Sequence, residues 1–422
     1  MYIYRQIADP LKSLVKTPVG KCLILTGARQ TGKTTLLQRE FTPGYEYHSF
    51  DEVLTRQDLA RRPAAEWLAR DRSYIFDEVH KSPGFLGTVK VILDRGKESN
   101  RVILSGSAQI QLLSAVRESL AGRSVTRELF PLTVAEMAGV SRPVACDLFS
   151  SESTRQVGEL IRESSFSERM VESAAAARVK LDHVIAWGGM PALLELEEDE
   201  HRWIWLEEYC RTYLQRDVSD LGRVSDLDNF VRLERAASHR TAGILNYADL
   251  ARDADLSPLT AKKYMRYLDL SYQTFLLDAF RKPGATRFIK APKLHWVDIG
   301  VQRALSGLRS GLTGPQFESV VVGELVKLAK SLRLDVEMSY LRTKDGREVD
   351  LLVRLPTGAY LAWEVKSSAR AAPADARHLR GLEPLLDGPL LAGFILYRGR
   401  EVHAWDKNLF ALPAPVLFAE NV

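Results

Sequence analysis

Short apolar runs alternate with amphipathic stretches over the first 138 residues of the chain. The runs have the length of strands, and the stretches between them have the apolar spacing of helices. This alternation predicts βαβ units, and therefore a mostly parallel sheet between two helical layers. The expected strands lie at 22–26, 45–50, 73–76, 101–104 and 125–130, and the expected helices near 33–40, 53–69, 84–96 and 108–119.

Beyond residue 140 the pattern changes. Residues 140–180 are rich in Ser, Glu, Arg and Ala, which predicts a connector that contains helices. Helices are also expected over 181–235, and a small helical module followed by strands over 241–280. Aromatic residues at helical spacing predict a packing stripe there, formed by Trp203, Trp205, Tyr209 and Tyr213. Strand and helix then alternate again, with helices expected at 314–331 and 373–386 and strands at 335–341, 348–354, 360–366 and 391–397.

Composition places the chain among globular proteins of several domains. Its 422 residues are 45% apolar and 27% charged, which suits roughly two to four domains. A net charge of +4 permits a nucleic-acid partner without implying one. Cys22, Cys146 and Cys210 match no metal-ligand spacing, so we expect reduced core residues. With no secretion signal and no apolar run near the roughly 18 residues of a membrane span, we expect a cytoplasmic protein without membrane association.

One glycine-rich segment carries the strongest chemical signal. It follows the first expected strand and opens an amphipathic helix, the context that a P-loop (Walker A motif) requires. There, backbone N–H groups at a helix N-terminus surround phosphates. We expect Lys33 to reach the β and γ phosphates of ATP and the Thr34 hydroxyl to ligate Mg²⁺. The expected nucleotide-binding residues are Gly27, Ala28, Arg29, Gln30, Thr31, Gly32, Lys33, Thr34 and Thr35.

An acidic pair follows the third expected strand. Alone, Asp77 and Glu78 would be read as a solvated turn, but about 45 residues after a P-loop they fit a Walker B pair. Asp77 would then hold Mg²⁺ through water, and Glu78 would polarise the attacking water.

Two further positions are candidates for the same site. Ser107, or Ser105, at the end of the fourth expected strand has a hydroxyl that can sense the γ phosphate; the alternative is a plain polar strand end. Arg123 lies before the last strand, where it is either an arginine finger for a neighbouring subunit or a surface arginine.

Taken together, these segments resemble the prokaryotic AAA+ ATPases that carry a C-terminal domain of unknown function. The resemblance lies in Gly-Ala-Arg-Gln-x-Gly-Lys-Thr at 27–34, Asp-Glu at 77–78, Leu-x-Gly-Ser at 104–107, Ser-Leu-Ala-Gly-Arg at 119–123 and Pro-Leu-Thr-x-x-Glu at 131–136. It continues at 188–191 and 213–217 and covers nearly the whole chain. It implies a homo-oligomeric ring, and it favours Arg123 as a finger.

The middle of the chain has the rhythm of a helix-turn-helix. The first helix would be capped near Asn246, and the second by Ser257 with a proline at its first position. Lys262, Lys263 and Arg266 would project from the second helix towards DNA, with a wing that begins at 275–280. The alternative is a winged helix used only for packing or protein contact.

The tail carries a pattern of acids that suggests metal chemistry. Asp350 and the segment Glu364-Val-Lys366 lie on two expected strands of a hairpin that turns at 356–358, so the side chains can share one face. With Glu318 on the preceding helix, the two strand carboxylates would bind Mg²⁺, and Lys366 would stabilise the attacking hydroxide. The order resembles the PD-(D/E)xK nuclease superfamily. Folds of this kind are often retained for binding alone, so cleavage stays open.

These observations predict an α/β chain of four segments. They are a three-layer P-loop AAA+ domain at 1–140, a helical connector or lid at 141–235, a winged-helix-like domain at 236–308 and a restriction-endonuclease-like domain at 309–422. The expected function is hydrolysis of Mg-ATP coupled to DNA binding or processing. The alternative is a regulatory ATP switch whose tail binds a partner and cuts nothing.

Overall fold

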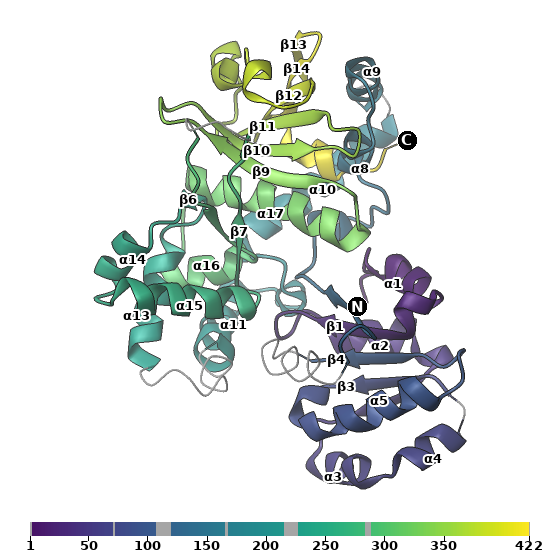
Figure 1. Ribbon diagram of the computed structural model, residues 1–422. Helices are drawn as coiled ribbons and strands as arrows, with labels where there is room; N and C mark the ends of the chain where they lie inside the picture. Colours follow the sequence, from purple (N-terminus) through teal and green to yellow (C-terminus); the bar gives the residue numbers. More distant parts are fainter. Residues whose placement is uncertain are drawn as a thin grey trace.

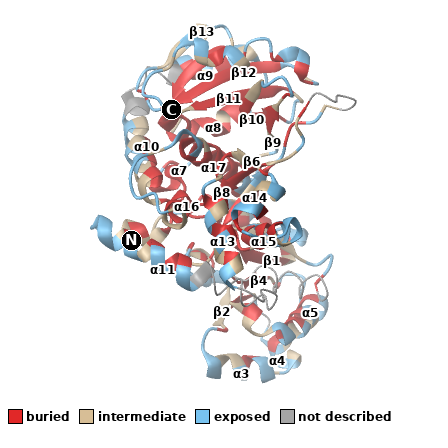
Figure 2. Ribbon diagram, turned by 90° about the vertical axis from the view of Figure 1, so that its left-hand side faces the viewer, coloured by how far each residue is buried: buried red, intermediate tan, exposed pale blue. Residues whose placement is uncertain are grey.

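The computed structural model describes residues 2–70, 72–106, 120–164, 168–214, 227–282 and 288–421. Two sheets lie at opposite ends of the molecule, and a helical part packs beside them (Figure 1). Buried residues concentrate in the sheets and in the helices that cover them, whereas the outer helices near residues 53–69 are largely exposed (Figure 2). None of the helices in these ranges is long and apolar enough to cross a membrane.

The N-terminal sheet is parallel, with the strand order β2-β3-β4-β1-β5. Its central strand is buried throughout, because both faces are covered by apolar clusters. This confirms a parallel sheet between helices. The elements are α1 (Ala8–Val15), β1 (Cys22–Thr26), α2 (Lys33–Glu40), β2 (Glu46–Ser49), α3 (Val53–Arg61), α4 (Ala64–Ala69), β3 (Tyr74–Asp77), α5 (Leu86–Arg95), β4 (Val102–Ser105) and β5 (Val125–Glu128).

The helix expected at 53–69 is two helices. Arg62 has extended backbone angles and stands before Pro63, and α4 begins directly after that proline. A residue before proline disfavours the α conformation, so the helix breaks there. The helix expected at 108–119 lies outside the described residues.

Helices from the centre of the chain cover one face of the C-terminal sheet. That sheet has the order β13-β14-β12-β11-β10-β9, and its core includes apolar residues of α8, α9 and α10. The backbone N–H of Val144 donates to the carbonyl of Ala419. The expected boundaries at 140, 235 and 308 stay predictions. The elements are α7 (Val134–Met137), α8 (Val144–Phe149), α9 (Thr154–Ser164), α10 (Glu168–Trp187), α17 (Gly314–Leu332), β9 (Glu337–Arg342), β10 (Glu348–Arg354), β11 (Tyr360–Lys366), β12 (Leu390–Tyr397), β13 (His403–Asp406) and β14 (Leu409–Pro413).

The helix expected at 373–386 was wrong. Two short 3₁₀ turns, Pro373–His378 and Glu383–Leu385, occupy that stretch. Gly381 between them has φ 61°, and Pro384 lacks the N–H that a helix interior needs. Apolar residues of the turns still pack on the sheet, which explains the misleading periodicity.

The middle of the chain forms a helical module around a small sheet, with its own apolar core. The strands are antiparallel in the order β6-β8-β7. Both expected caps are confirmed, since Asn246 accepts from the N–H groups of Ala248 and Asp249, and Ser257 from that of Thr260. The elements are α11 (Asp199–Tyr209), a π-helical turn (Cys210–Leu214), α13 (Leu227–Ser238), β6 (Gly243–Ile244), α14 (Tyr247–Asp253), α15 (Pro258–Leu270), β7 (Thr274–Leu277), β8 (Lys293–Trp296) and α16 (Ile299–Ser306).

A glycine pair after α10 lets the end of this helix meet the start of α16. The Asp298 carboxylate accepts from the N–H of Gly189 at 2.7 Å and caps α16 through Val301 at 3.1 Å. A Cβ on Gly188 would lie 2.0 Å from Asp298 Oδ1, and one on Gly300 would lie 1.9 Å from the Trp187 carbonyl oxygen. Only glycine leaves room for this junction.

We therefore expect Gly300→Ala to destabilise the protein by about 3 kcal/mol, because overpacking a rigid backbone contact forces the elements apart. Thermal unfolding followed by circular dichroism measures the change. The matched control is Gly87→Ala in α5, where a Cβ meets nothing within 4 Å, so that helix propensity stabilises this variant slightly. Equal melting temperatures for the two variants would contradict the packing argument.

Candidate functional site

The expected P-loop joins β1 to α2 with glycines where the backbone requires them. Gly27 has φ 143° and Gly32 φ 94°, and a Cβ on Gly27 would lie 2.2 Å from the Leu129 carbonyl oxygen. Gln30 also takes a left-handed conformation, with φ 62°. The Thr31 hydroxyl closes the loop by donating to the Ala28 carbonyl at 2.9 Å. Arg29 and Gln30 lie at its outer side, partly or fully exposed.

Lys33 is buried at the first position of α2. Its Nζ donates to the carbonyl oxygens of Gly27 at 2.9 Å and Ala28 at 2.7 Å. The ammonium is therefore held inside the curve of the loop, where phosphate oxygens would replace these carbonyls. Thr34 and Thr35 follow on the exposed side of the same turn.

The Asp77 carboxylate at the end of β3 gathers hydroxyl groups from three elements. Its Oδ2 accepts from Thr34 of α2 and from Tyr47 of β2, both at 2.7 Å. Its Oδ1 accepts from Ser105 of β4. A carboxylate beside a threonine hydroxyl is an oxygen donor set that fits Mg²⁺. The contact with Tyr47 has no counterpart in the sequence analysis.

Glu78 is the next residue, in a left-handed conformation with φ 54°. Its Oε2 lies 3.1 Å from Nδ1 of His80. Burial would raise the pKa of Glu78, but the hydrogen bond and charge of His80, with the charges of Lys33 and Lys81, lower it to about 2. The carboxylate is therefore ionised at neutral pH, as a group that attracts a water proton must be.

A buried arginine, Arg5, contacts the backbone of the P-loop. Nη1 of Arg5 donates to the Thr31 carbonyl at 2.8 Å, Nη2 to the Phe130 carbonyl at 2.6 Å, and Nε lies 3.1 Å from Glu136 Oε2. Glu136 also accepts from the backbone N–H of Gln6 and of Thr133. Glu136 ends the Pro-Leu-Thr-x-x-Glu segment, but a single sequence gives no sign that Arg5 is its partner.

Of the remaining nucleotide-site candidates within the described residues, only Ser105 is seen to contact Asp77. Ser107 lies outside the described residues, while Ser105 contacts Asp77. Arg123 is 41% exposed and pairs with Asp94 of α5, with 2.7 Å between Nε and Oδ1. That surface pair leaves Arg123 on the outside of the N-terminal part. The middle module also touches the loop, since the Tyr209 hydroxyl donates to the Arg29 carbonyl at 3.3 Å.

The second helix of the middle module presents a basic face. Lys262, Lys263 and Arg266 are exposed on α15, and Leu259, 80% exposed, lies on the same side one turn earlier. The segment expected to begin the wing, 275–280, starts in β7, which pairs with β8, and its end lies along β9 of the C-terminal sheet. The Phe280 N–H donates to the Tyr340 carbonyl of β9 at 2.6 Å.

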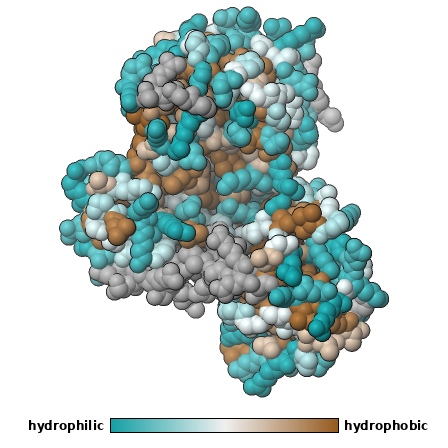
Figure 3. All heavy atoms as spheres, viewed as in Figure 1, coloured by the Kyte–Doolittle hydropathy of each residue, from teal (hydrophilic) through white to brown (hydrophobic). Residues whose placement is uncertain are grey.

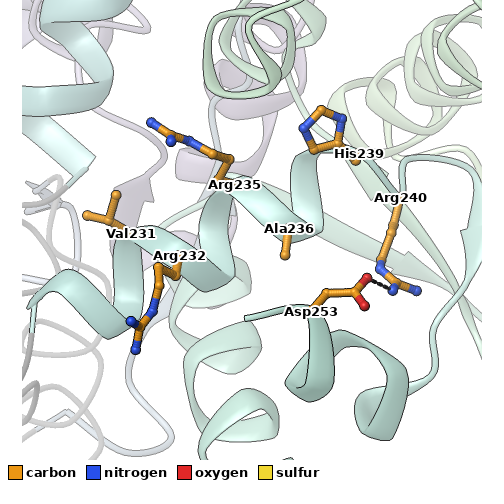
Figure 4. A pocket seen from close by; sticks show the side chains of 7 residues that line it. All are labelled: Val231, Arg232, Arg235, Ala236, His239, Arg240 and Asp253. Carbon is orange, nitrogen blue, oxygen red and sulfur yellow. Dashed lines mark hydrogen bonds and ion pairs between the residues drawn. The ribbon is translucent and has the colours of Figure 1, made fainter. Parts of the chain in front are cut away.

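A basic cavity of about 650 Å³ opens between α13 and α14, and Figure 4 shows the side chains around it. At one side of it, Arg240 and Asp253 form an ion pair. The cavity includes no P-loop residue, so it is separate from the nucleotide site. Its lining residues are Val231, Arg232, Arg235, Ala236, His239, Arg240 and Asp253.

The acidic residues expected in the tail lie close together, and two of them, Glu318 and Asp350, contact the ammonium of a lysine. Strands β10 and β11 pair with Leu351 opposite Trp363, which places Asp350 beside Glu364. Nζ of Lys293, from β8, lies 2.7 Å from Glu318 Oε1 and 3.3 Å from Asp350 Oδ1. The sequence pattern of the tail gives no sign of this lysine, because Lys293 belongs to the middle module.

Glu348 and Lys366 complete the charge pairs of this cluster. Lys293 Nζ is 2.6 Å from Glu348 Oε1, and Lys366 Nζ is 2.9 Å from Glu364 Oε2. Burial lowers the pKa of Lys293, but the carboxylates, led by Glu318, outweigh it and raise that pKa. Burial, followed by the charge of Asp350, raises the pKa of Glu318. Within the described ranges, no three His, Cys, Asp or Glu residues are grouped so as to hold a metal ion.

We expect Arg5→Met to weaken ATP binding at least tenfold and to lower the melting temperature. The change leaves Glu136 buried without its cation, which typically costs about 3–5 kcal/mol, and removes the donor to the Thr31 carbonyl. Titration calorimetry and thermal unfolding measure the two effects. The control is Arg95→Met, an exposed residue of α5. If the folded Arg5→Met variant binds ATP with unchanged affinity, Arg5 does not contribute to nucleotide binding.

Comparison with known proteins matches three parts of the chain. Residues 19–138 match the model of an AAA domain, and residues 178–311 and 313–417 match two domains of unknown function (DUF8612 and DUF4143). Uncharacterized protein Rv2008c of Mycobacterium tuberculosis and Uncharacterized protein Mb2031c of Mycobacterium bovis are each 26% identical over 410 residues, which is 96% of this chain and 81% of theirs. With the parallel sheet and its P-loop, the first match supports an AAA-type nucleotide-binding ATPase whose C-terminal part is a domain of unknown function.

Proposed function

We propose that this chain binds Mg-ATP at the P-loop and hydrolyses it with Glu78 as the residue that polarises water. The contact between the Thr34 hydroxyl and the Asp77 carboxylate carries the proposal. In this contact the two groups that would hold Mg²⁺, Thr34 directly and Asp77 through water, lie 2.7 Å apart at the carboxyl edge of a parallel sheet. Backbone amides and Lys33 would neutralise the phosphates, and Ser105, bonded to Asp77, would fix the orientation of that carboxylate.

We further propose that turnover occurs between subunits of a ring. Arg123 is exposed, and its partner Asp94 belongs to a surface ion pair of small net stability. It can therefore exchange Asp94 for the γ phosphate of a neighbour at little cost. A finger of this kind contributes about 10³ to 10⁵ in rate.

DNA is the partner that we propose for the middle module. The helices α13, α14 and α15, with the three-stranded antiparallel sheet in the order β6-β8-β7, support assignment of this region as a winged helix. Lys262, Lys263 and Arg266 lie on one exposed face of α15, as phosphate contacts require. Arginines around the cavity on α13 add positive charge to the same module.

A regulatory switch is the second candidate. Here ATP would set the state of the assembly, and the nuclease-like tail with Glu318, Asp350, Glu364 and Lys366 would bind without cutting. One observation favours it: the tail carboxylates already hold the ammonium of Lys293.

For ATP turnover we expect Glu78→Gln to lower kcat by about 10² to 10⁴, with ATP affinity kept, because only the general base is lost. Lys33→Ala should instead abolish binding. A coupled ATPase assay and titration calorimetry measure the two constants. The control is Glu66→Gln, an exposed acid on α4. If Glu78→Gln hydrolyses ATP at the wild-type rate, Glu78 is not the base.

For DNA we expect wild-type protein to retain duplex DNA and to hydrolyse ATP faster in its presence. Changing Lys262, Lys263 and Arg266 to Ala should weaken DNA retention. It should also make the slope of log affinity against log salt concentration shallower, by the equivalent of up to about three phosphate contacts. Filter binding across a salt series measures both. A triple change of Lys16, Lys90 and Arg95, also exposed, is the control. Equal losses of DNA retention in the two triple variants would show only non-specific electrostatic attraction. If the wild-type protein retains no DNA, the regulatory switch is favoured.

A further inference from the structure

Lys293 occupies an unusual position for a charged side chain. It lies on the central strand of the small sheet in the middle module, yet it is only 2% exposed. Its Nζ reaches out of that module to carboxylates on α17 and β10. A buried ammonium needs compensating charge, and here three carboxylates supply it.

The geometry resembles that of an ion surrounded by oxygen ligands. Glu348, Glu318 and Asp350 place one oxygen each at 2.6, 2.7 and 3.3 Å from Nζ. A divalent cation in the same space would take carboxylate oxygens at about 2.0–2.6 Å. The ammonium therefore stands where such a cation would have to sit, and its charge repels one.

The surrounding contacts hold the lysine in place. The segment before β8 is bound to β9, with the Tyr340 N–H donating to the Asp278 carbonyl at 3.0 Å and the Ile289 N–H to the Arg342 carbonyl at 2.9 Å. Beside Glu318, the Thr241 hydroxyl donates to that of Ser319 at 2.8 Å. The middle module and the tail are thus fastened together around the cluster. On the face in Figure 3, apolar residues line the recess between these parts, besides smaller patches elsewhere on the surface.

We propose that Lys293 is a built-in counter-cation that locks the middle module to the tail and closes the acidic cluster to divalent metal. Loss of the ammonium then leaves a cluster of carboxylates that accepts a divalent cation. The proposal concerns the junction of the middle module with the tail, and its test needs neither ATP hydrolysis nor DNA binding.

The test uses Lys293→Met in the full chain without nucleotide, with Mn²⁺ as the probe. Calorimetry should show Mn²⁺ binding at least tenfold tighter than in wild type. The matched control is Lys293→Met with Asp350→Asn, which should lose the added binding because one of its ligands is gone. Equal Mn²⁺ binding in wild type and Lys293→Met, or added binding that persists in the control, would overturn the proposal.

Stability provides a second measurement, because three buried carboxylates without a cation weaken the fold. Mn²⁺ should raise the melting temperature of Lys293→Met and leave that of wild type unchanged, since a ligand that binds only the folded state stabilises it. A variant that stays unfolded in millimolar Mn²⁺ also contradicts the proposal. Cleavage of DNA by metal-loaded Lys293→Met would in addition support nuclease chemistry. Metal binding without cleavage would support the proposed role of Lys293 and would argue against nuclease activity of the tail.

Discussion

The nucleotide site depends on one buried carboxylate. Asp77 ends β3 and accepts hydrogen bonds from Thr34, Tyr47 and Ser105, which come from a helix and from two other strands. Because a buried carboxylate is costly without partners, these donors and the carboxylate fix one another. The start of α2, and with it the P-loop, is thereby held at the edge of the sheet.

Local patterns in the sequence were sufficient for most elements. The P-loop, the acidic pair and the strands β10 and β11 lie where their periodicity and spacing predict, because short-range rules govern them. The caps at Asn246 and Ser257 were predicted for the same reason. Failures occurred where backbone chemistry overrides periodicity, as at Pro63 and Gly381.

Contacts between distant segments were beyond prediction from one chain. Arg5 meets Glu136 across the P-loop, and Lys293 meets Glu318 and Asp350 across two parts of the molecule. Each of these residues belongs to a segment with an ordinary local pattern, and that pattern does not predict which distant residue it contacts. The acids of the tail were found by their spacing, but the cation between them changes their chemistry.

The pairing of Val144 with Ala419 has a consequence for how the chain is made. Helices α8 and α10 share a core with β12 and β14, which come much later in the chain. At 5–20 residues per second, about 14–55 s separate the synthesis of Val144 from that of Ala419. Until then, the part of α10 that contacts the turn Ala414–Phe418 lacks this partner. We therefore expect nascent chains of this protein to bind chaperones that shield exposed apolar helices until β12 and β14 have been made.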